Sequence, residues 1–402
     1  MNAADTAFIL VCSALVMFMT PGLALFYGGL VRARNVLSTT MHSFILLGVA
    51  SIVWAVIGYT LAFGPDIGGV IGGLDFAFLN GVGMEPSESV TNIPHLLFMV
   101  FQCMFAVITP ALISGAYAER IRFRAMLLFS VLWLVVVYAP MAHWVWGGGW
   151  MFSLGALDFA GGAVVHMSSA AAALAAAHVL GRRHGHGREP FVPHNLPMTV
   201  LGAGILWFGW FGFNAGSALA ANGLAANAFV TTHLCAAAAS ISWVAAEWLH
   251  SGKPTTLGAA SGAVAGLVVI TPAAGFVAPM PAIIMGLVGG ALCYGGVLMK
   301  HVFKYDDALD VVGVHGVGGT FGALATGIFA TTAVNTASGL LEGNPSQLWI
   351  QFISVVATWL FCYVASRILF HVVDALVGLR ADTESEVAGL DVSEHNEAGY
   401  QL

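Results

Sequence analysis

The chain has 402 residues, of which 58% are hydrophobic and only 8% are charged. Soluble globular domains carry roughly 25% charged residues, so this composition excludes an ordinary soluble protein and indicates an all-α integral membrane protein with repeated apolar spans. The formal net charge is −7, and because the acidic residues gather near the C-terminus and in one loop, it implies no nucleic-acid partner.

Apolar runs, bounded by glycine, proline or charged residues, predict eleven transmembrane helices. In chain order they cover 6–30, 39–63, 94–118, 123–145, 159–180, 195–218, 226–250, 256–272, 279–300, 307–333 and 347–371. Gly258, Gly262 and Gly266 recur at four-residue spacing in the eighth run, which predicts close packing against a neighbouring helix. We therefore expect a transmembrane domain at residues 1–377 and a polar C-terminal tail at residues 378–402. The orientation and the resemblance described below indicate that this tail is cytoplasmic and regulatory.

The distribution of basic residues predicts the orientation of these spans. Cytoplasmic loops of membrane proteins carry the excess of Lys and Arg. All 13 basic residues follow or end the first, third, fifth, seventh, ninth and eleventh spans, and the alternate loops have none. We expect a multi-pass protein of the cell (inner) membrane, with the N-terminus outside and the C-terminus in the cytoplasm.

The first five spans and the next five predict an inverted 5+5 helix repeat, followed by an eleventh helix, because an odd number of spans reverses the second half. Asp158 precedes His166 by eight residues near the start of the fifth span, and Asp307 precedes His315 by eight near the start of the tenth. Eight helical residues rise about 12 Å, so both histidines should reach the middle of the bilayer. Their matched depth favours a shared site over two separate helix–helix hydrogen bonds.

Ionisable residues inside membrane spans are functional candidates by default. Asp158 is expected to cap the fifth span and to have a second role as well, whereas capping is the preferred interpretation of Asp307. Two adjacent buried histidines should stay neutral, because burial disfavours the imidazolium form. Such a pair suits a small polar molecule better than a bare cation.

Aromatic residues and one hydroxyl are predicted to converge on an outer vestibule. They are Phe105 in the third span, Trp146 at the outer end of the fourth, and Phe213 and Ser217 in the sixth. Phe101 lies one turn from Phe105 on the same helix face, and Trp210 shares the face of Phe213 and Ser217. Aromatic faces attract a cation, and a hydroxyl accepts a hydrogen bond from it. Because an intact cation is costly to desolvate in an apolar passage, the pattern favours ammonium, which can shed a proton, over potassium, which cannot.

These residues lie in stretches that together resemble the ammonium transporter family (Amt/Mep/Rh), in particular its bacterial Amt members. The stretches are FMTPGLALFYGGLVRARNVLS, FQCMFAVITPALISGAYAERIRF, HWVWGGG, LDFAGGAVVH, PHNLPM, GWFGFNAGSA, DVVGVHGVGG and GLRADTESEVAGLD. By this resemblance Phe105, Trp146 and Ser217 are similar to an external ammonium-recruitment site, with Phe101 and Trp210 nearby.

The same resemblance implies a stacked gate at Phe105 and Phe213. It implies a twin-histidine pore at His166 and His315 and an essential acidic residue at Asp158. The implied activity is recruitment of NH4+, its deprotonation, and conduction of ammonia, alone or with a proton, into the cytoplasm. The family is not enzymatic, and neither a cofactor nor a metal is expected.

The resemblance further implies a homotrimer in the lipid bilayer and, at the cytoplasmic face, a PII-type nitrogen signalling protein as partner. The polar, acidic tail is expected to fold against the basic loops and to help dock this partner. Two other functions remain open: an ammonium-sensing receptor that signals through its tail with little flux, and an electron carrier that binds haem through His166 and His315. The histidine-lined route favours transport over the receptor. The small residues and the absence of other paired intramembrane histidines at haem-like spacing in the sequence argue against the electron carrier.

Overall fold

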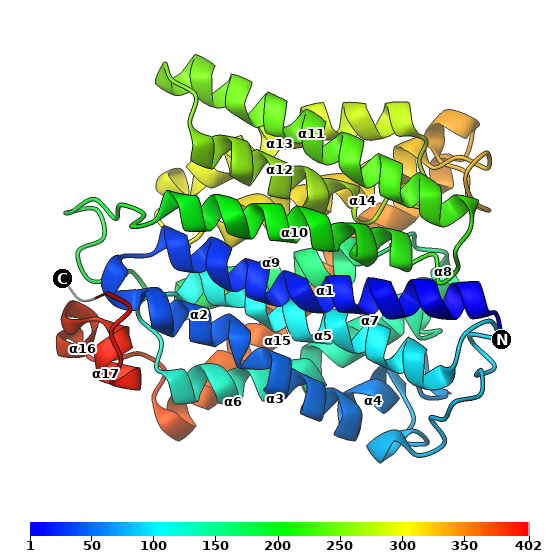
Figure 1. Cartoon of the computed structure of the whole chain (residues 1–402), viewed down its shortest axis with the longest axis horizontal. Coiled ribbons are helices and arrows are strands. Elements are labelled where there is room, and N and C mark those ends of the chain that lie inside the picture. The colour runs from blue at the N-terminus through cyan, green and yellow to red at the C-terminus, as the bar shows by residue number, and fades with distance from the viewer. Residues whose placement is uncertain (401–402) are drawn as a thin grey trace.

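The computed structural model describes residues 1–400 and is built almost entirely of helices that lie side by side (Figure 1). The helices of the first half are α1 (Ala3–Leu30), η1 (Ala33–Asn35), α2 (Val36–Phe44), α3 (Leu46–Val53), η2 (Trp54–Gly58), α4 (Tyr59–Phe63), η3 (Ala77–Leu79), α5 (His95–Tyr117), α6 (Phe123–Trp133), η4 (Leu134–Tyr138), α7 (Ala139–Trp146), α8 (Trp150–Leu154), η5 (Gly162–Met167) and α9 (Ser168–Leu180). Two short strands, β1 (Asp66–Ile67) and β2 (Ile71–Gly72), pair antiparallel in the loop after α4.

The second half contains α10 (Leu196–Gly216), α11 (Gly223–Ser251), α12 (Thr256–Ile270), α13 (Pro279–Phe303), η6 (Val312–Gly316), α14 (Val317–Phe329), η7 (Leu340–Glu342) and α15 (Pro345–Val377). The tail forms α16 (Thr383–Ala388) and α17 (Leu390–His395). Residues 401 and 402, the last two of the predicted tail, lie outside the described residues.

Ten helical stretches among residues 1–400 are long and apolar enough to cross a membrane. They are Ala3–Leu30, Ala33–Phe63, His95–Tyr117, Phe123–Leu154, Gly162–Leu180, Leu196–Gly216, Gly223–Ser251, Pro279–Phe303, Val312–Phe329 and Pro345–Val377. The remaining expected span, 256–272, corresponds to α12, which has only 15 residues. A membrane helix usually needs about 17 residues or more, so the count of eleven remains a prediction.

Two spans begin later than the apolar pattern predicts. The fifth span begins at Gly162 rather than near residue 159. The tenth span begins near Val312, at the start of η6, rather than at residue 307. In both places the chain first turns through a left-handed residue, Gly161 with φ 115° and Asp310 with φ 63°. These turns let the preceding aspartates, Asp158 and Asp307, reach the first helical N–H groups, as capping residues do.

Close helix packing relies on glycine, as expected for a membrane bundle. The glycines spaced four residues apart in α12 lie against α11, as predicted. An added Cβ at Gly262 would lie 2.6 Å from the Cβ of Trp243, and one at Gly266 would lie 2.6 Å from the Cβ of Ala239. The long α1 packs along α10 in the same way, and an added Cβ at Gly202 would lie 2.3 Å from the backbone nitrogen of Phe26. Larger residues at these positions would push the helices apart.

The bundle has two distinct ends (Figure 1). Helix α1 runs from the N-terminus to the end where α16 and α17 lie, which we call the tail end. The N-terminus and the C-terminal part of α10 lie at the other end, the N-terminal end.

Candidate functional site

A cavity of about 470 Å³ opens between the helices at the N-terminal end. Three predicted recruitment residues line it: Phe105, Trp146 and Ser217. The Trp146 indole stands edge-on to the Phe105 ring with centroids 5.9 Å apart, and its Nε1–H donates to the backbone oxygen of Asp158 at 2.9 Å. The Ser217 hydroxyl donates to the backbone oxygen of Phe213 at 2.9 Å, which leaves its oxygen lone pairs available to accept a hydrogen bond from a guest.

The other two residues predicted near this site do not line the cavity. Phe101 is fully buried behind Phe105, with ring centroids 5.1 Å apart. Trp210 lies deeper, where its indole stacks on His166 at 5.4 Å and its Nε1–H donates to the Thr271 hydroxyl at 2.9 Å. Phe101 therefore supports the cavity floor, and Trp210 belongs to the space below it.

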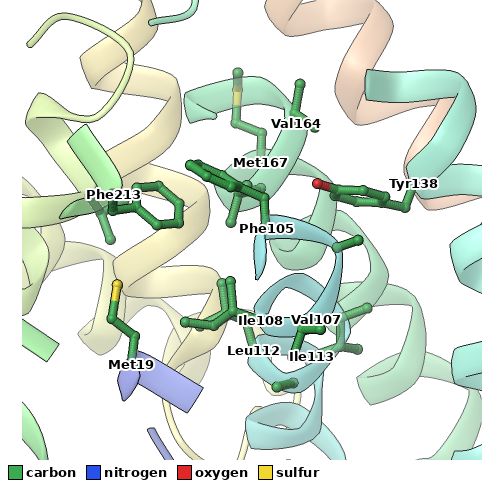
Figure 2. Packing of buried hydrophobic residues seen from close by; sticks show 14 of the residues in the cluster. Met19, Phe105, Val107, Ile108, Leu112, Ile113, Tyr138, Val164, Met167 and Phe213 are labelled. Carbon is green, nitrogen blue, oxygen red and sulfur yellow. The ribbon is translucent and has the colours of Figure 1, made fainter. Parts of the chain in front are cut away.

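The rings of Phe105 in α5 and Phe213 in α10 lie side by side (Figure 2). Their ring centroids are 4.2 Å apart, the planes are inclined by 33°, and each residue is only 1% exposed. Phe105 lines the outer cavity, whereas Phe213 lines a separate cavity below. The two rings are therefore the partition between these spaces, in the position predicted for a gate.

The cavity below the two rings is small and almost entirely apolar. Its volume is about 10 Å³, which is close to the minimum that one water-sized molecule needs. Its polar groups are supplied mainly by His166 and His315, whose Nδ1 atoms are 3.1 Å apart and whose rings are inclined by 26°. The Nε2 atom of His166 is buried without a hydrogen-bond partner among residues 1–400.

The Nδ1–Nδ1 contact defines what two neutral histidines present to this cavity. One Nδ1 must carry a proton and donate it to the other. The donor imidazole then has an acceptor Nε2, and its partner has an Nε2–H donor. The pair can therefore offer one donor and one acceptor to a small neutral molecule without either ring becoming charged.

Equivalent local structures place the two histidines. His166 lies in the π-helical turn η5 and His315 in the π-helical turn η6. The Asp158 carboxylate accepts hydrogen bonds from the four N–H groups of residues 161–164 at 2.6–3.3 Å. The Asp307 carboxylate accepts one from the N–H of Val312 at 2.7 Å. The capping predicted for both aspartates is confirmed.

A third cavity, of about 60 Å³, lies on the tail side of His315. It shares His315, Phe26 and Tyr27 with the small cavity, and Asp310 lines it as well. Asp310 forms an ion pair with Lys300. The three cavities thus follow one another from the N-terminal end to the tail end, separated by the two phenylalanine rings and by the histidines.

A buried ion-pair cluster at the tail end was not anticipated from the sequence. The Arg183 guanidinium lies 2.9 Å from the Glu119 carboxylate and 2.8 Å from that of Asp306, and Arg32 lies 3.0 Å from Glu119. Burial alone would raise the pKa of Glu119, but Arg183 and Arg32 outweigh it and lower that pKa below its usual value. The cluster joins the loops after α1, α5, α9 and α13. The sequence shows the charged residues of these loops but does not predict that they pair.

The tail packs on these loops, as its polarity predicted. Its acidic side chains accept hydrogen bonds from loop and helix-start N–H groups: Glu386 from His184, Asp391 from Leu37 and Ser38, and Glu394 from Phe123. Burial raises the pKa of Asp391. The two acceptor bonds of this carboxylate fix α17 on the first turn of α2.

Comparison with known sequences identifies relatives along the whole chain. A sequence profile described as the Ammonium Transporter Family matches residues 7–400. An ammonium transporter of Bacillus subtilis is 54% identical over 404 aligned residues, which cover 100% of this chain and 99% of the relative. The relatives of this kind are named as transporters, which are not enzymes.

Solved structures show the same architecture. Mep2 of Saccharomyces cerevisiae superposes with a TM-score of 0.90 at 38% identity, over 96% of this chain and 88% of that one. A structure titled Sensor Amt Protein superposes with a TM-score of 0.90 at 28% identity, over 98% of each chain.

Proposed function

Because this chain belongs to the ammonium transporter family, we propose that it recruits NH4+ in the outer cavity, removes a proton, and conducts ammonia past His166 and His315 to the cytoplasm. The observation that carries this proposal is the histidine pair inside a cavity of about 10 Å³. Such a space accepts one small molecule, and the pair offers it hydrogen bonds in place of hydration.

Recruitment rests on three groups of the outer cavity. The ring faces of Phe105 and Trp146 attract a cation, each by roughly 0.5–2 kcal/mol depending on how dry the site is. The Ser217 oxygen accepts a hydrogen bond, a contact that ammonium can make and that potassium replaces only by ion–dipole attraction. We assign Phe101 and Trp210 supporting roles, because neither lines this cavity.

Proton loss, to water in the outer cavity, is required at the Phe105–Phe213 partition. Moving an intact cation into this dry, apolar space would cost many kcal/mol, whereas a neutral ammonia molecule loses only its hydrogen bonds to water. The Asp158 carboxylate, held by four N–H groups next to the Trp146 side chain, favours the cation on the outer side. Below the rings, His166 and His315 replace the lost hydrogen bonds.

The remaining parts of the proposal concern the whole assembly. The matched turns η5 and η6 support an inverted repeat, and the basic loops support a cytoplasmic tail end in the inner membrane. A homotrimer and a PII-type protein docked on residues 378–402 complete the proposal. The tail suits docking because it packs at the tail end of the bundle, on the loop at His184 and on the first turns of α2 and α6.

A second candidate is an ammonium-sensing receptor that signals through the tail with little flux. It is favoured by the match to the structure titled Sensor Amt Protein. Uptake into proteoliposomes separates the two functions. Transport predicts rapid, saturable accumulation of ammonium nitrogen that depends on the amount of protein, whereas saturable binding without accumulation above protein-free liposomes would favour the receptor.

A further inference from the structure

The membrane-facing edge of the bundle near the tail end carries basic groups that the proposed transport does not use. Helix α15 presents an apolar outer face, on which Leu360 is 65% exposed, Val364 46% and Ile368 57%. Arg367 interrupts this face and is itself exposed. An exposed guanidinium within an apolar stretch is unusual unless its charge meets water or a headgroup at the bilayer surface.

Hydrogen bonds connect Arg367 to the neighbouring helix α9. Its Nη1–H donates to the Tyr363 hydroxyl at 2.9 Å, and that hydroxyl lies 2.9 Å from Nδ1 of His178. Since the Tyr363 oxygen already accepts from Arg367, its O–H can donate to Nδ1 of a neutral His178. The Nε2–H of His178 and the other guanidinium N–H groups of Arg367 then remain to bind something else.

Two more cations border this pair. The His178 ring stands edge-on to the Tyr305 ring with centroids 6.4 Å apart. Lys304, the residue before Tyr305, directly follows α13. The Arg182 guanidinium donates to the backbone oxygen of Lys304 at 2.9 Å. Contacts therefore link Arg182 to the backbone of Lys304, Tyr305 to His178, and His178 through Tyr363 to Arg367. We refer to these exposed basic residues as one surface.

These cations differ from those of the buried cluster. Arg32 and Arg183 each have a carboxylate within 4.0 Å. Among residues 1–400, no carboxylate lies within that distance of Arg182, Lys304 or Arg367. The nearest acidic residue along α15, Asp374, accepts from the Leu379 N–H. The positive charge of the surface is thus not neutralised by the protein.

We propose that Arg182, Lys304, His178 and Arg367 bind the headgroup phosphate of an anionic phospholipid in the leaflet at the tail end. Arginine N–H groups match phosphate oxygens in geometry and charge, and basic pockets between membrane helices on the cytoplasmic side bind anionic headgroups. The apolar face of Leu360, Val364 and Ile368 continues from Arg367 toward the bilayer interior. That continuity favours a lipid, whose acyl chains it would cover, over free phosphate.

The test uses the purified full-length protein in mild detergent. Its melting midpoint is followed while phosphatidylglycerol, phosphatidylcholine with the same acyl chains, or inorganic phosphate is added. Phosphatidylglycerol should raise the midpoint at lower concentration than phosphatidylcholine, and inorganic phosphate should have little effect. In Arg367→Gln the concentration of phosphatidylglycerol required should rise about fivefold, the factor that corresponds to about 1 kcal/mol for one basic group near an anionic surface.

Two control variants separate a site from general surface charge. Lys253→Gln removes an exposed lysine between α11 and α12 and should leave the response unchanged, while Arg367→Lys should retain part of it. If Arg367→Gln fails to fold, Lys304→Gln takes its place. Equal responses to the two lipids, an equal loss in Lys253→Gln, or an effect of inorganic phosphate equal to that of phosphatidylglycerol would each overturn the proposal.

Discussion

At Asp158, one substitution tests the role of the negative charge. Asn keeps one acceptor oxygen for two of the four N–H groups, while its amide nitrogen cannot accept from the other two. Because Asn still caps a helix, Asp158→Asn should be less stable but should fold and assemble. It removes a negative charge that, for an ion placed about 6 Å away and an effective dielectric near 20, would contribute roughly 3 kcal/mol. We therefore expect the rate of ammonium uptake into proteoliposomes to fall about 100-fold. Normal uptake would leave Asp158 with capping alone.

The histidine pair provides a second test at the residue scale. Each imidazole makes its ring hydrogen bond to the other, so His166→Ala or His315→Ala leaves one buried nitrogen unpaired, at a cost of about 1–3 kcal/mol. The variants should therefore stay folded and assembled but change the rate or selectivity of ammonium transport. His250→Ala, at an exposed position, is the matched control. Aggregation of both pore variants, but not of the control, would indicate that the pair serves packing instead.

The sequence locates residues on helix faces better than it locates them along the pore. Phe105, Trp146 and Ser217 meet at the outer cavity as predicted. Trp210 shares a face with Ser217, but seven residues of helix place it about 10 Å deeper, against His166. Periodicity gives the direction of a side chain, whereas the depth at which neighbouring helices meet is set by tertiary packing.

At the scale of elements, the apolar runs predict the helices because membrane spans must satisfy every backbone hydrogen bond internally. What they cannot predict is how charged loops pair. The contacts of Glu119 with Arg32 and Arg183 join three loops. No pattern in the sequence predicts that these residues lie close together. The π-helical turns η5 and η6 were likewise not anticipated, since their residues fit an ordinary helix.

The tail is the element whose proposed role can be removed without touching the pore. Deleting residues 382–402 should weaken docking of a PII-type trimer, because it removes α16 and α17 together with their contacts to the loops. Assembly of the transporter should persist, since no membrane helix is shortened. Affinity is measured with the purified partner and its nucleotides. An affinity equal to that of the intact chain would show that the tail does not take part in docking.

At the scale of the whole molecule, orientation can be tested independently of transport. Single cysteines introduced into the loop 64–92 should react with a membrane-impermeant reagent added outside intact cells. Cysteines in the loop 181–194 should react only after the cells are permeabilised, because the basic residues of that loop favour the cytoplasmic side of the membrane. The opposite pattern would reverse the proposed direction of every span and place the outer cavity inside the cell.

The central claim is that the transported ion loses its proton before it passes the Phe105–Phe213 partition. A direct measurement compares ammonium with potassium, an ion of similar size without a proton to lose, in the same proteoliposomes and under the same concentration gradient. The proposed mechanism predicts rapid ammonium flux and potassium flux no greater than in protein-free liposomes. Potassium flux comparable to that of ammonium would contradict it, because an intact cation would then be crossing the apolar passage.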